Sequence, residues 1–595
     1  MSDFIFSSHR RQQGELKKYL TAIYKADLPE VQEYHGEWGS LGVSRSLYTG
    51  FQPLESDSHL FLVIGGPILK FADNRHLTGD DPTAGTRRIR DRWLSGSMQW
   101  DVDVSGPFVI LSIDKVHRTV TCITDLMLFI PVYRYLDNHR ILLGTHVDAL
   151  ASAAGPELDA DQVSIADFLM HHAVTWPFTF YDHIHQLHPA SKHTFTVGSG
   201  PAKEMDLQEY WLPEQSDKYG NVKEAALALR NGVQQEVAQI TDGMDKVAQF
   251  ISGGTDSRVI AGLLPDRLQR EGFIFLDEMN REGRIAQKAA KAYNLNFLPE
   301  FRGKTHYLDI LPEACDLIGS GQQHIHAHAL VFNRRCNLNQ YQAVFGGYSA
   351  DVFLKNYYSG SSRNEWKSPY ASRRGSLKNA TRGADIQHYI PDHVKEMVKD
   401  RRMAHLEKVR HVRNESALEW ARLWPASNRP ALPNLGANRR LFRSYELFLC
   451  SAVAKISAEV PPAWKEHHML YHQAFHPFLK KSKWLIHNDG HLPYFSNRIN
   501  RLPTWCASVW RLRKKLRKRG SEIVHQGPWC NWKTVRLTPE WESWLQICRQ
   551  EEIKSQKLFT VPAGDIAGNS DMYLKQVVNL FQVMYFFSRS TGRLL

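Results

Sequence analysis

A short apolar run that ends in a serine and two glycines carries the clearest chemistry in this sequence. Residues Val247 to Ile251 are followed by Ser252-Gly253-Gly254-Thr255-Asp256-Ser257. Apolar residues at helical spacing then continue from Val259 to Leu264. The pattern predicts a strand, a tight turn and a helix N-terminus, where backbone N–H groups and the positive helix end bind anions, usually phosphate.

The side chains of this turn indicate how a polyphosphate would be bound. Ser252 and Ser257 offer hydroxyl donors, and Gly253 and Gly254 are expected to adopt positive φ and to allow a close approach of the backbone. Asp256 cannot bind phosphate directly, which points to a bridging Mg²⁺. The Gly-x-x-x-x-Gly-Lys-Ser/Thr spacing of a Walker loop is absent.

The six residues resemble the pyrophosphate-binding loop Ser-Gly-Gly-x-Asp-Ser of the ATP pyrophosphatase superfamily. Enzymes of that superfamily cleave ATP between the α and β phosphates and adenylate an acyl or carbonyl oxygen. The resemblance implies that ATP is bound by Ser252, Gly253, Gly254, Thr255, Asp256 and Ser257, with Asp256 also a metal ligand and a catalytic residue. The alternative is a glycine turn followed by Asp and Ser by chance.

Composition describes ordinary globular material. The chain has 595 residues, of which 43% are hydrophobic and 23% charged, enough for two to four domains. No apolar run approaches the ~18 residues of a membrane span, and the start lacks a signal-peptide pattern. The seven cysteines contain no C-x-x-C pair, which favours reduced thiols and a cytoplasmic location.

The net charge of +12 is concentrated in a basic run, Arg511 to Arg519. One interpretation is a nucleic-acid or anionic-surface patch. We favour a solvated helix face with Leu512 and Leu516 turned inward, because no RNA-binding motif accompanies the run. Nucleic acid is therefore not an expected partner.

The elements that must position this chemistry begin with antiparallel strands. Short apolar runs bounded by Gly, Asp, Asn and Pro predict strands at 60–64, 108–112, 119–123 and 140–144. Residues 1–30 are polar and helix-compatible, so the first strand is expected only after them.

This half resembles the N-terminal domain of asparagine synthetase. The matching stretches, in the same order, are 105–109, 125–133, 144–150, 166–169 and 177–189. The resemblance implies an antiparallel Ntn-hydrolase-like domain of the glutamine amidotransferase type 2 over residues 1–205. Glutamine-hydrolysing members expose a cysteine as their N-terminal residue. Here Ser2 stands at that place, far from any expected strand, and the family's glutamine clamp is missing, so we expect a scaffold without glutaminase activity.

Strands that alternate with helices predict a parallel α/β domain over residues 206–595, of the adenine nucleotide α-hydrolase type with helical additions. An entry helix is expected at 222–240, and a second strand at 273–276 ends in Leu276, which we include among the nucleotide-binding residues. Glu282 opens the next helix. It either orders the adenylating site or favours the helix N-terminus.

A second marker lies at Ala343–Phe353, where a buried strand ends in glycines followed by an acidic residue. It resembles the synthetase loop Gly-x-Gly-x-Asp-x-x-Phe beside the pyrophosphate. The resemblance implies that Gly347 contacts the nucleotide and that Asp351 is a second metal ligand and catalytic residue. Tyr348 replaces the family's glutamate and is a further catalytic candidate, which implies chemistry other than aspartate amidation. The alternative is a chance glycine loop.

The remaining predictions concern the last third of the chain. Residues 355–440 are expected to form a mobile insertion over the site, and 441–456 an amphipathic helix. The family places a cation that neutralises pyrophosphate near here, and the register offers Arg498, or else Lys481 or Lys483.

The sequence His324-Ile-His-Ala-His328 could bind a metal. Because no carboxylate or cysteine lies nearby in the sequence, we favour structural or substrate-contacting histidines.

Together these resemblances imply an ATP- and Mg²⁺-dependent, AMP-forming carbon–nitrogen ligase of the asparagine synthase type. Its partners would be a small-molecule or peptide carboxylate and an amine or ammonia donor. Two alternatives stay open: a cyclase of the peptide or β-lactam type or an enzyme that amidates sugar acids, and a catalytically inactive scaffold. A thiolating or tRNA-modifying relative is disfavoured, because such enzymes usually carry catalytic cysteine pairs.

Overall fold

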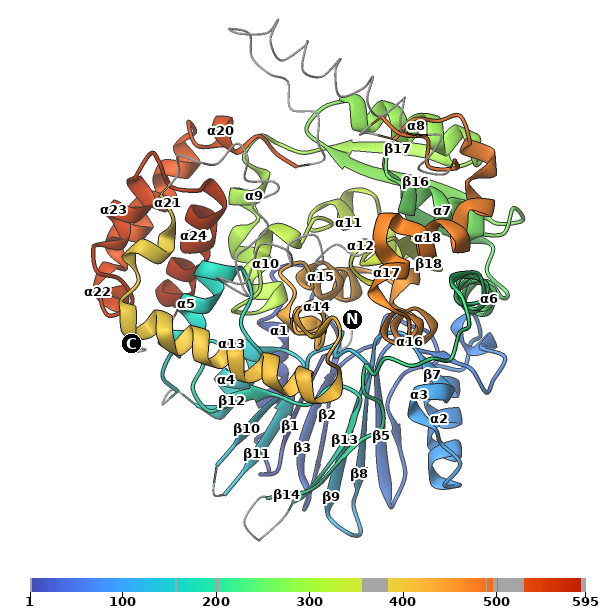
Figure 1. Ribbon diagram of the computed structural model, residues 1–595. Helices are drawn as coiled ribbons and strands as arrows, with labels where there is room; N and C mark the ends of the chain where they lie inside the picture. Colours follow the sequence, from blue (N-terminus) through green and yellow to red (C-terminus); the bar gives the residue numbers. More distant parts are fainter. Residues whose placement is uncertain are drawn as a thin grey trace, which may run out of the picture.

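Two antiparallel sheets and one parallel sheet form the framework of the protein (Figure 1). The computed structural model describes residues 3–137, 139–155, 158–197, 203–355, 384–487, 490–495, 500 and 529–589. Within them, no helix has the length and apolar character needed to cross a membrane. The fold is a two-part α/β arrangement, with antiparallel strands first and the parallel sheet second.

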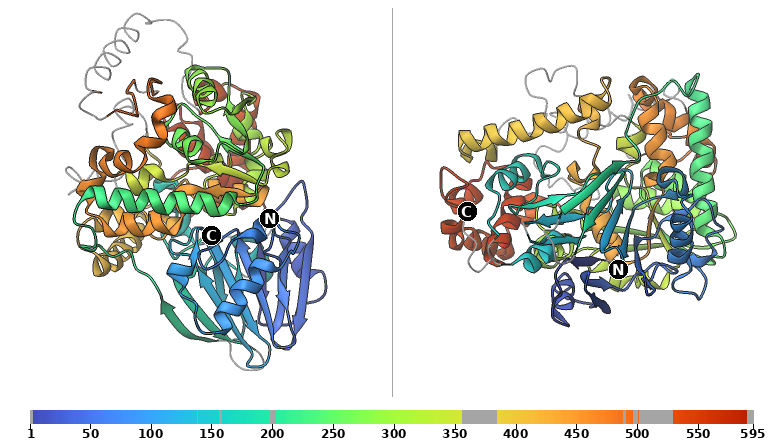
Figure 2. Two further views of the ribbon diagram at one scale, coloured as in Figure 1. Left: turned by 90° about the vertical axis from the view of Figure 1, so that its right-hand side faces the viewer. Right: turned by 90° about the horizontal axis from the view of Figure 1, so that it is seen from below.

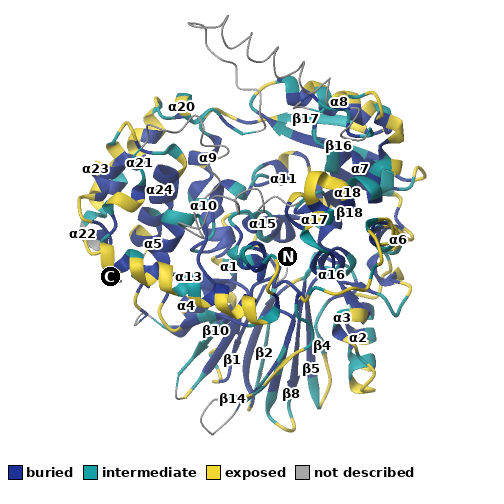
Figure 3. Ribbon diagram, in the orientation of Figure 1, coloured by how far each residue is buried: buried dark blue, intermediate teal, exposed yellow. Residues whose placement is uncertain are grey.

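The first part is a sandwich of two six-stranded sheets, ordered β12-β10-β11-β1-β3-β2 and β14-β13-β9-β8-β5-β4. Their inner faces share one apolar core, and Figure 3 shows the strands mostly buried. All four predicted strands are confirmed, as β5, β8, β9 and β11. The bounds are β1 Phe4–Ser7, β2 Val31–Gly36, β3 Gly39–Ser44, β4 Leu54–Glu55, β5 His59–Gly65, β8 Phe108–Asp114, β9 Thr119–Thr124, β10 Tyr133–Leu136, β11 Ile141–Gly144, β12 Ile184–Gln186, β13 Ser191–Thr196 and β14 Lys203–Glu209.

The expectation that no strand precedes residue 30 was wrong. Strand β1 lies in the middle of its sheet, between β11 and β3. Phe4 and Phe6 enter the core of the sandwich, while Ile5 packs on the other side of the sheet. Four residues are too short a run to be recognised, and the partners of β1 come from distant parts of the chain. Ser2 lies outside the described residues.

A buried ion cluster fixes β1 to the second part of the molecule. The Asp3 carboxylate, with no exposed surface, accepts hydrogen bonds from Arg440 Nη2 at 2.7 Å, Arg440 Nε at 2.8 Å and Arg439 Nη2 at 3.0 Å. Thr145 and Tyr24 also donate to it, at 2.8 and 3.1 Å. Burial would raise the pKa of Asp3, but the two guanidinium groups hold it well below its usual value.

The second part is built on a five-stranded parallel sheet with the order β17-β16-β15-β18-β19. The strands are β15 Lys246–Phe250, β16 Gln269–Leu276, β17 Asn296–Phe301, β18 Ala343–Gly346 and β19 Ser444–Glu446. Helices α6 Val222–Thr241, α7 Thr255–Leu263 and α8 Arg281–Ala292 confirm the predicted alternation. The chain runs from β15 to one edge and then returns to the other side of β15. Ligands of such sheets bind where the strand order reverses, here beyond the carboxyl ends of β15 and β18.

The helix predicted at 441–456 is confirmed only for residues 451–456, which begin α16 Ser451–Glu459. Before them, α15 Pro433–Leu441 ends and β19 adds an edge strand to the sheet. β19 has only three residues, all buried, so no alternation of apolar and polar residues marks it as a strand.

The C-terminal helices lie on the opposite side of the molecule from α6 (Figure 2). Instead of a mobile insertion, residues from 384 onward contain the long helix α13 Asp392–Val412, which packs on α5 Gln162–His171 of the first part. The C-terminal helices α21 Pro539–Gln550, α23 Ala563–Gly568 and α24 Leu574–Arg589 pack together, and α24 also contacts α5. Residues 356–383 and the basic run 511–519 lie outside the described residues. The proposed boundary at 205/206 falls inside β14.

Candidate functional site

The turn after β15 has the predicted strand–turn–helix form. Helix α7 begins at Thr255, and Ser252 and Ser257 brace the turn, since Ser257 Oγ accepts from Ser252 N at 3.0 Å and Ser252 Oγ accepts from Gly254 N at 3.1 Å. The expectation of positive φ at the two glycines was wrong. Gly254 has φ −77°, and neither it nor Gly253 is among the described residues with positive φ. Gly254 instead faces Ser252 Oγ, which would lie 3.1 Å from an added Cβ atom.

Glu282 contacts the turn directly. Its Oε1 accepts a hydrogen bond from Gly253 N at 2.6 Å. Burial raises the pKa of this carboxyl, an effect that the Gly253 hydrogen bond opposes. Both roles considered for Glu282 stay open, because it contacts Gly253 N and also lies in the first turn of α8, which Asn280 caps by accepting from Gly283 N at 3.2 Å. The contact also demonstrates that the turn offers an N–H donor to a negatively charged oxygen.

The second marker lies directly beside this turn, because β18 is hydrogen-bonded to β15. A Cβ atom added to Gly347 would lie 3.3 Å from Asp256 Cβ, so the absence of a side chain lets the two loops pack together. The chain passes through Ser349 with φ 77° and enters the short helix α12 Ala350–Leu354, whose first turn holds Asp351. The structure therefore brings Asp256 and Asp351 to one place.

Lys355 connects these two aspartates and was not identified from the sequence. Its Nζ donates to Asp256 Oδ1 at 2.5 Å and to Asp351 Oδ1 at 2.8 Å. The signal that could have revealed it is its spacing, since Asp351 and Lys355 are four residues apart at a helix. The side chain is 8% exposed and its ammonium lies 4.3 Å from the centre of the Tyr471 ring.

Asp256, Asp351 and Lys355 form a triad in which the pKa of each group depends on burial and on the neighbouring charges. Burial raises the pKa of Asp256 despite the neighbouring ammonium. Burial acts in the same direction on Asp351, whose side chain is 61% exposed, but there the Lys355 ammonium prevails and the pKa is lowered. Burial opposes the charge of Lys355, yet the two carboxylates raise its pKa. The triad is thus a cation held by two carboxylates.

A buried glutamate at the end of β19 forms the other side of the site. Glu446 Oε2 accepts from Tyr348 N at 2.9 Å, and a Cβ atom on Gly346 would collide with the Glu446 carboxylate at 2.1 Å. Burial raises the pKa of Glu446 to about 7. The predicted Tyr348 lies beside it, with the Arg429 guanidinium 4.9 Å from its ring centre.

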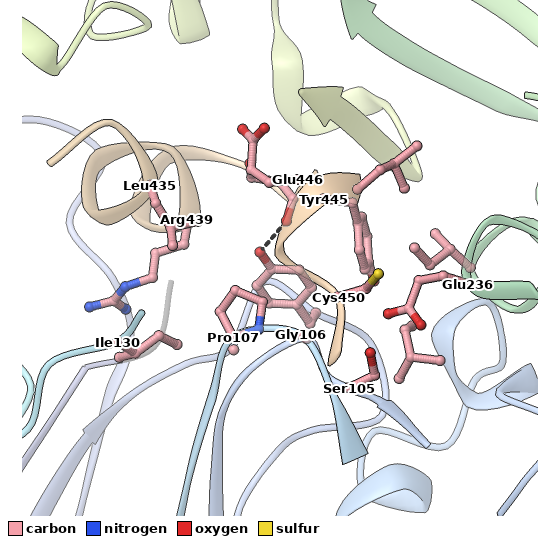
Figure 4. A pocket seen from close by; sticks show the side chains of 17 residues that line it. Ser105, Gly106, Pro107, Ile130, Glu236, Leu435, Arg439, Tyr445, Glu446 and Cys450 are labelled. Carbon is pink, nitrogen blue, oxygen red and sulfur yellow. Dashed lines mark hydrogen bonds between the residues drawn. The ribbon is translucent and has the colours of Figure 1, made fainter. Parts of the chain in front are cut away.

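Glu446 also lines a cavity between the two parts of the molecule (Figure 4). Its lining includes Ser105, Gly106 and Pro107 from the first part, and Glu446 and Cys450 from the second. The cavity has about 30 Å³, enough for a few water molecules.

Arg258 ties the turn to the segment that flanks it. Its side chain is fully buried, and Nη2 donates to Gly253 O at 2.8 Å while Nη1 donates to Leu485 O at 2.9 Å. Arg258 is a further residue of the turn that the sequence did not indicate.

The other predicted residues lie apart from this centre. Leu276 ends β16 with its side chain fully buried, and its carbonyl accepts from Arg302 N at 2.8 Å. Lys481 bonds to both Asp266 oxygens at 2.9 Å, and Lys483 lies over Trp484. Arg498 lies outside the described residues.

The histidines of the 324–328 segment have no metal cluster around them among the described residues. His324 is buried, its Nε2 lies 3.0 Å from Tyr307 O, and burial lowers its pKa to about 4. His328 Nδ1 lies 3.0 Å from the Tyr307 hydroxyl. These contacts agree with a structural role.

Comparison with known proteins finds no matching family model and no matching curated protein. Among the solved structures that match are the following three. An allosteric regulatory enzyme of purine biosynthesis matches at 9% identity over 42% of this chain and 60% of its own, with TM-score 0.24. NMN synthetase from Francisella tularensis matches at 19% over 23% and 59%, with TM-score 0.18. Glutamine PRPP amidotransferase from B. subtilis, complexed with ADP and GMP, matches at 8% over 50% and 65%, with TM-score 0.22. The matches span less than two thirds of each known chain, and these values assign the chain to no family.

Proposed function

We propose that this protein is an ATP-dependent carbon–nitrogen ligase that adenylates a carboxylate, releases pyrophosphate and forms an amide. The observation that carries the proposal is the meeting of the Ser252–Ser257 turn with Asp351 where the strand order reverses. A helix N-terminus with two convergent carboxylates beside it suits a metal-bound polyphosphate.

In the first step the triphosphate would lie at the N-terminus of α7, with Gly253 N donating to it in place of its bond to Glu282. The residues present fit a divalent cation, since Asp256 and Asp351 already converge on one positive charge. Asp256 and Asp351 would hold Mg²⁺, which supplies charge neutralisation of the phosphates. A substrate carboxylate oxygen attacks the α-phosphorus, the bond to the bridging oxygen breaks, and pyrophosphate leaves.

In the second step an amine attacks the acyl carbon, and AMP leaves with the bonding electron pair. The amine must lose a proton, and Glu446 is suited to accept it, because a pKa of about 7 leaves about half of its carboxyl groups ionised at neutral pH.

The nitrogen source that we favour is free ammonia or an amine on the substrate. At the start of β1 the Asp3 carboxylate is paired with Arg439 and Arg440 in a buried ion cluster. The acyl substrate would be a small molecule or peptide, with asparagine synthesis, ring closure and sugar-acid amidation as the candidate reactions.

Pyrophosphate release tests the proposal. The protein is incubated with ATP, Mg²⁺, ammonium and a panel of carboxylates, including aspartate, uronic acids and peptides, and AMP and pyrophosphate are quantified. The Asp256→Ala variant should release pyrophosphate at least ~100-fold more slowly, because its loss removes one of the two convergent carboxylates. The matched control is Asp266→Ala, which removes a 67% exposed aspartate from the same part of the chain. Equal release by wild type and Asp256→Ala would end the ligase proposal.

One observation favours a second candidate, a catalytically inactive scaffold. Glu282 and Lys355 fill the anion and cation positions with the chain's own groups. A scaffold would bind no ATP in calorimetry and would release no pyrophosphate with any carboxylate. A ligase would bind ATP in calorimetry even if the panel does not contain its carboxylate substrate.

A further inference from the structure

Lys355 lies where a divalent ion bridging Asp256 and Asp351 would lie. Its ammonium is within 2.5 and 2.8 Å of one oxygen of each carboxylate, and its side chain is 8% exposed. The Tyr471 ring, 4.3 Å from Nζ, supports it from the side. The position is therefore built for a cation, and the chain supplies one itself.

A metal ion and this ammonium cannot share the position. The two distances leave no space between Nζ and the carboxylate oxygens, and two cations there would repel each other. Binding of Mg²⁺ to the carboxylates requires Nζ to move away. Lysine has a flexible four-carbon stem and three donors, so it can rotate toward new acceptors without losing its charge.

The acceptors nearest to this position would be phosphate oxygens. Asp256 belongs to the first turn of α7, at whose N-terminus a polyphosphate would bind. An ammonium released from Asp256 and Asp351 thus has a compact, strongly charged acceptor beside it, and lysine commonly binds phosphate as a point charge.

We propose that Lys355 is a phosphate-binding cation that exchanges places with the metal. Without nucleotide it neutralises Asp256 and Asp351 and keeps Mg²⁺ out. With Mg-ATP the carboxylates bind the metal and Nζ binds the phosphates. This inference rests on the proposed function, because it requires a nucleotide in the Ser252–Ser257 turn.

If the exchange occurs, replacing Lys355 should raise the affinity for the metal ion alone and lower the affinity for the metal–nucleotide complex. In Lys355→Met, a substitution of similar length, the two aspartates lose their competing ammonium, and Mn²⁺ alone should bind about tenfold more tightly than to wild type. Mn²⁺-ATP should bind about 10- to 100-fold more weakly, because one charge-assisted hydrogen bond to phosphate is lost.

The experiment measures Mn²⁺ binding by electron paramagnetic resonance, and the binding of Mn²⁺ with a nonhydrolysable ATP analogue by calorimetry, for the full-length wild type and Lys355→Met. Lys455→Met is the matched control, since Lys455 forms a 2.7 Å ion pair with Asp101 away from the site. It should leave both affinities unchanged. Lys355→Arg, which keeps the charge, should recover part of the nucleotide affinity. Circular dichroism confirms that each variant is folded.

Each result decides the matter. The exchange is supported if Lys355→Met binds Mn²⁺ more tightly and the Mn²⁺-nucleotide complex more weakly than wild type does. If the variant binds both Mn²⁺ and the Mn²⁺-nucleotide complex more tightly, Lys355 only obstructs the site. If the variant binds Mn²⁺ more weakly or equally well, Lys355 does not compete with the metal. Either result overturns the inference. Failure of the proposed function is seen separately, as a wild type that binds the nucleotide but releases no pyrophosphate with any carboxylate. A wild type that binds no nucleotide refutes both.

Discussion

Replacing Glu446 with glutamine should make the protein more stable at pH 8 and at the same time suppress amide formation. The carboxyl is 7% exposed, and burial raises its pKa from 4.5 to about 7. The folded state therefore holds this proton more tightly than the unfolded chain does. Below pH 4.5 Glu446 is protonated in the folded and the unfolded state, so it does not lower the free energy of unfolding. As the pH rises from 4.5 through 7, the free energy of unfolding falls.

The size of the effect follows from the two pKa values. A change from 4.5 to about 7 corresponds to about 3 kcal/mol of unfolding free energy, lost between about pH 4.5 and 7 and constant above. Glutamine carries no charge to desolvate, and its carbonyl can still accept the hydrogen bond that Tyr348 N donates at 2.9 Å. Glu446→Gln should gain up to about 3 kcal/mol at pH 8 and nothing at pH 4.5.

Urea unfolding followed by tryptophan fluorescence at several values from pH 4.5 to 8 measures this difference. Glu236→Gln is the matched control, because Glu236 lines the same cavity but is paired with Lys70. It should lose about 1–3 kcal/mol at pH 8, since it leaves an ammonium without its partner. If Glu446→Gln is destabilised at pH 8 as the control is, burial does not govern the charge of Glu446 and the reasoning is refuted.

Activity provides the second measurement. If Glu446 takes the proton of the amine, amide formation by the wild type should rise with pH to a plateau above about pH 7. Glu446→Gln should be about 100- to 10,000-fold slower and lose this pH dependence, while pyrophosphate release in a single turnover persists. A variant with wild-type amide formation would exclude Glu446 as the base.

Two further substitutions test the ion cluster that joins the two parts of the molecule and the contact between Gly347 and Asp256. Asp3→Ala should lower the free energy of unfolding by about 3–5 kcal/mol in urea at pH 7, because it leaves Arg439 and Arg440 buried without their counter-ion. Since the pKa of Asp3 is lowered, this contribution is present above about pH 4 and is lost in acid, so the variant should approach wild type as the pH falls; an equal deficit at pH 3 would contradict the assignment. Gly347→Ala should weaken ATP binding about tenfold by pushing Asp256 away, because the new Cβ would lie 3.3 Å from Asp256 Cβ. Gly303→Ala, whose new Cβ meets nothing within 4 Å, should leave calorimetric affinity unchanged, and equal behaviour of the two variants would contradict the packing argument.

Local sequence determined the parts of the site that are formed by neighbouring residues. The turn from Ser252 to Ser257 was predictable because its strand, glycines and helix follow one another within a few residues. The same holds for the turn after β18, where strand, glycines and Asp351 are also consecutive. Alternating apolar residues likewise predicted the longer strands of the sandwich.

Tertiary structure alone decided which of these parts meet. β15 pairs with β18, almost a hundred residues later, and this pairing places Gly347 against Asp256 and Lys355 between two carboxylates. Strand β1 and strand β19 were missed, since short buried strands owe their conformation to partners far away in the chain. The charges of Glu446 and Lys355 depend in the same way on burial by distant segments, because desolvation is a property of the packed interior and not of the neighbouring sequence.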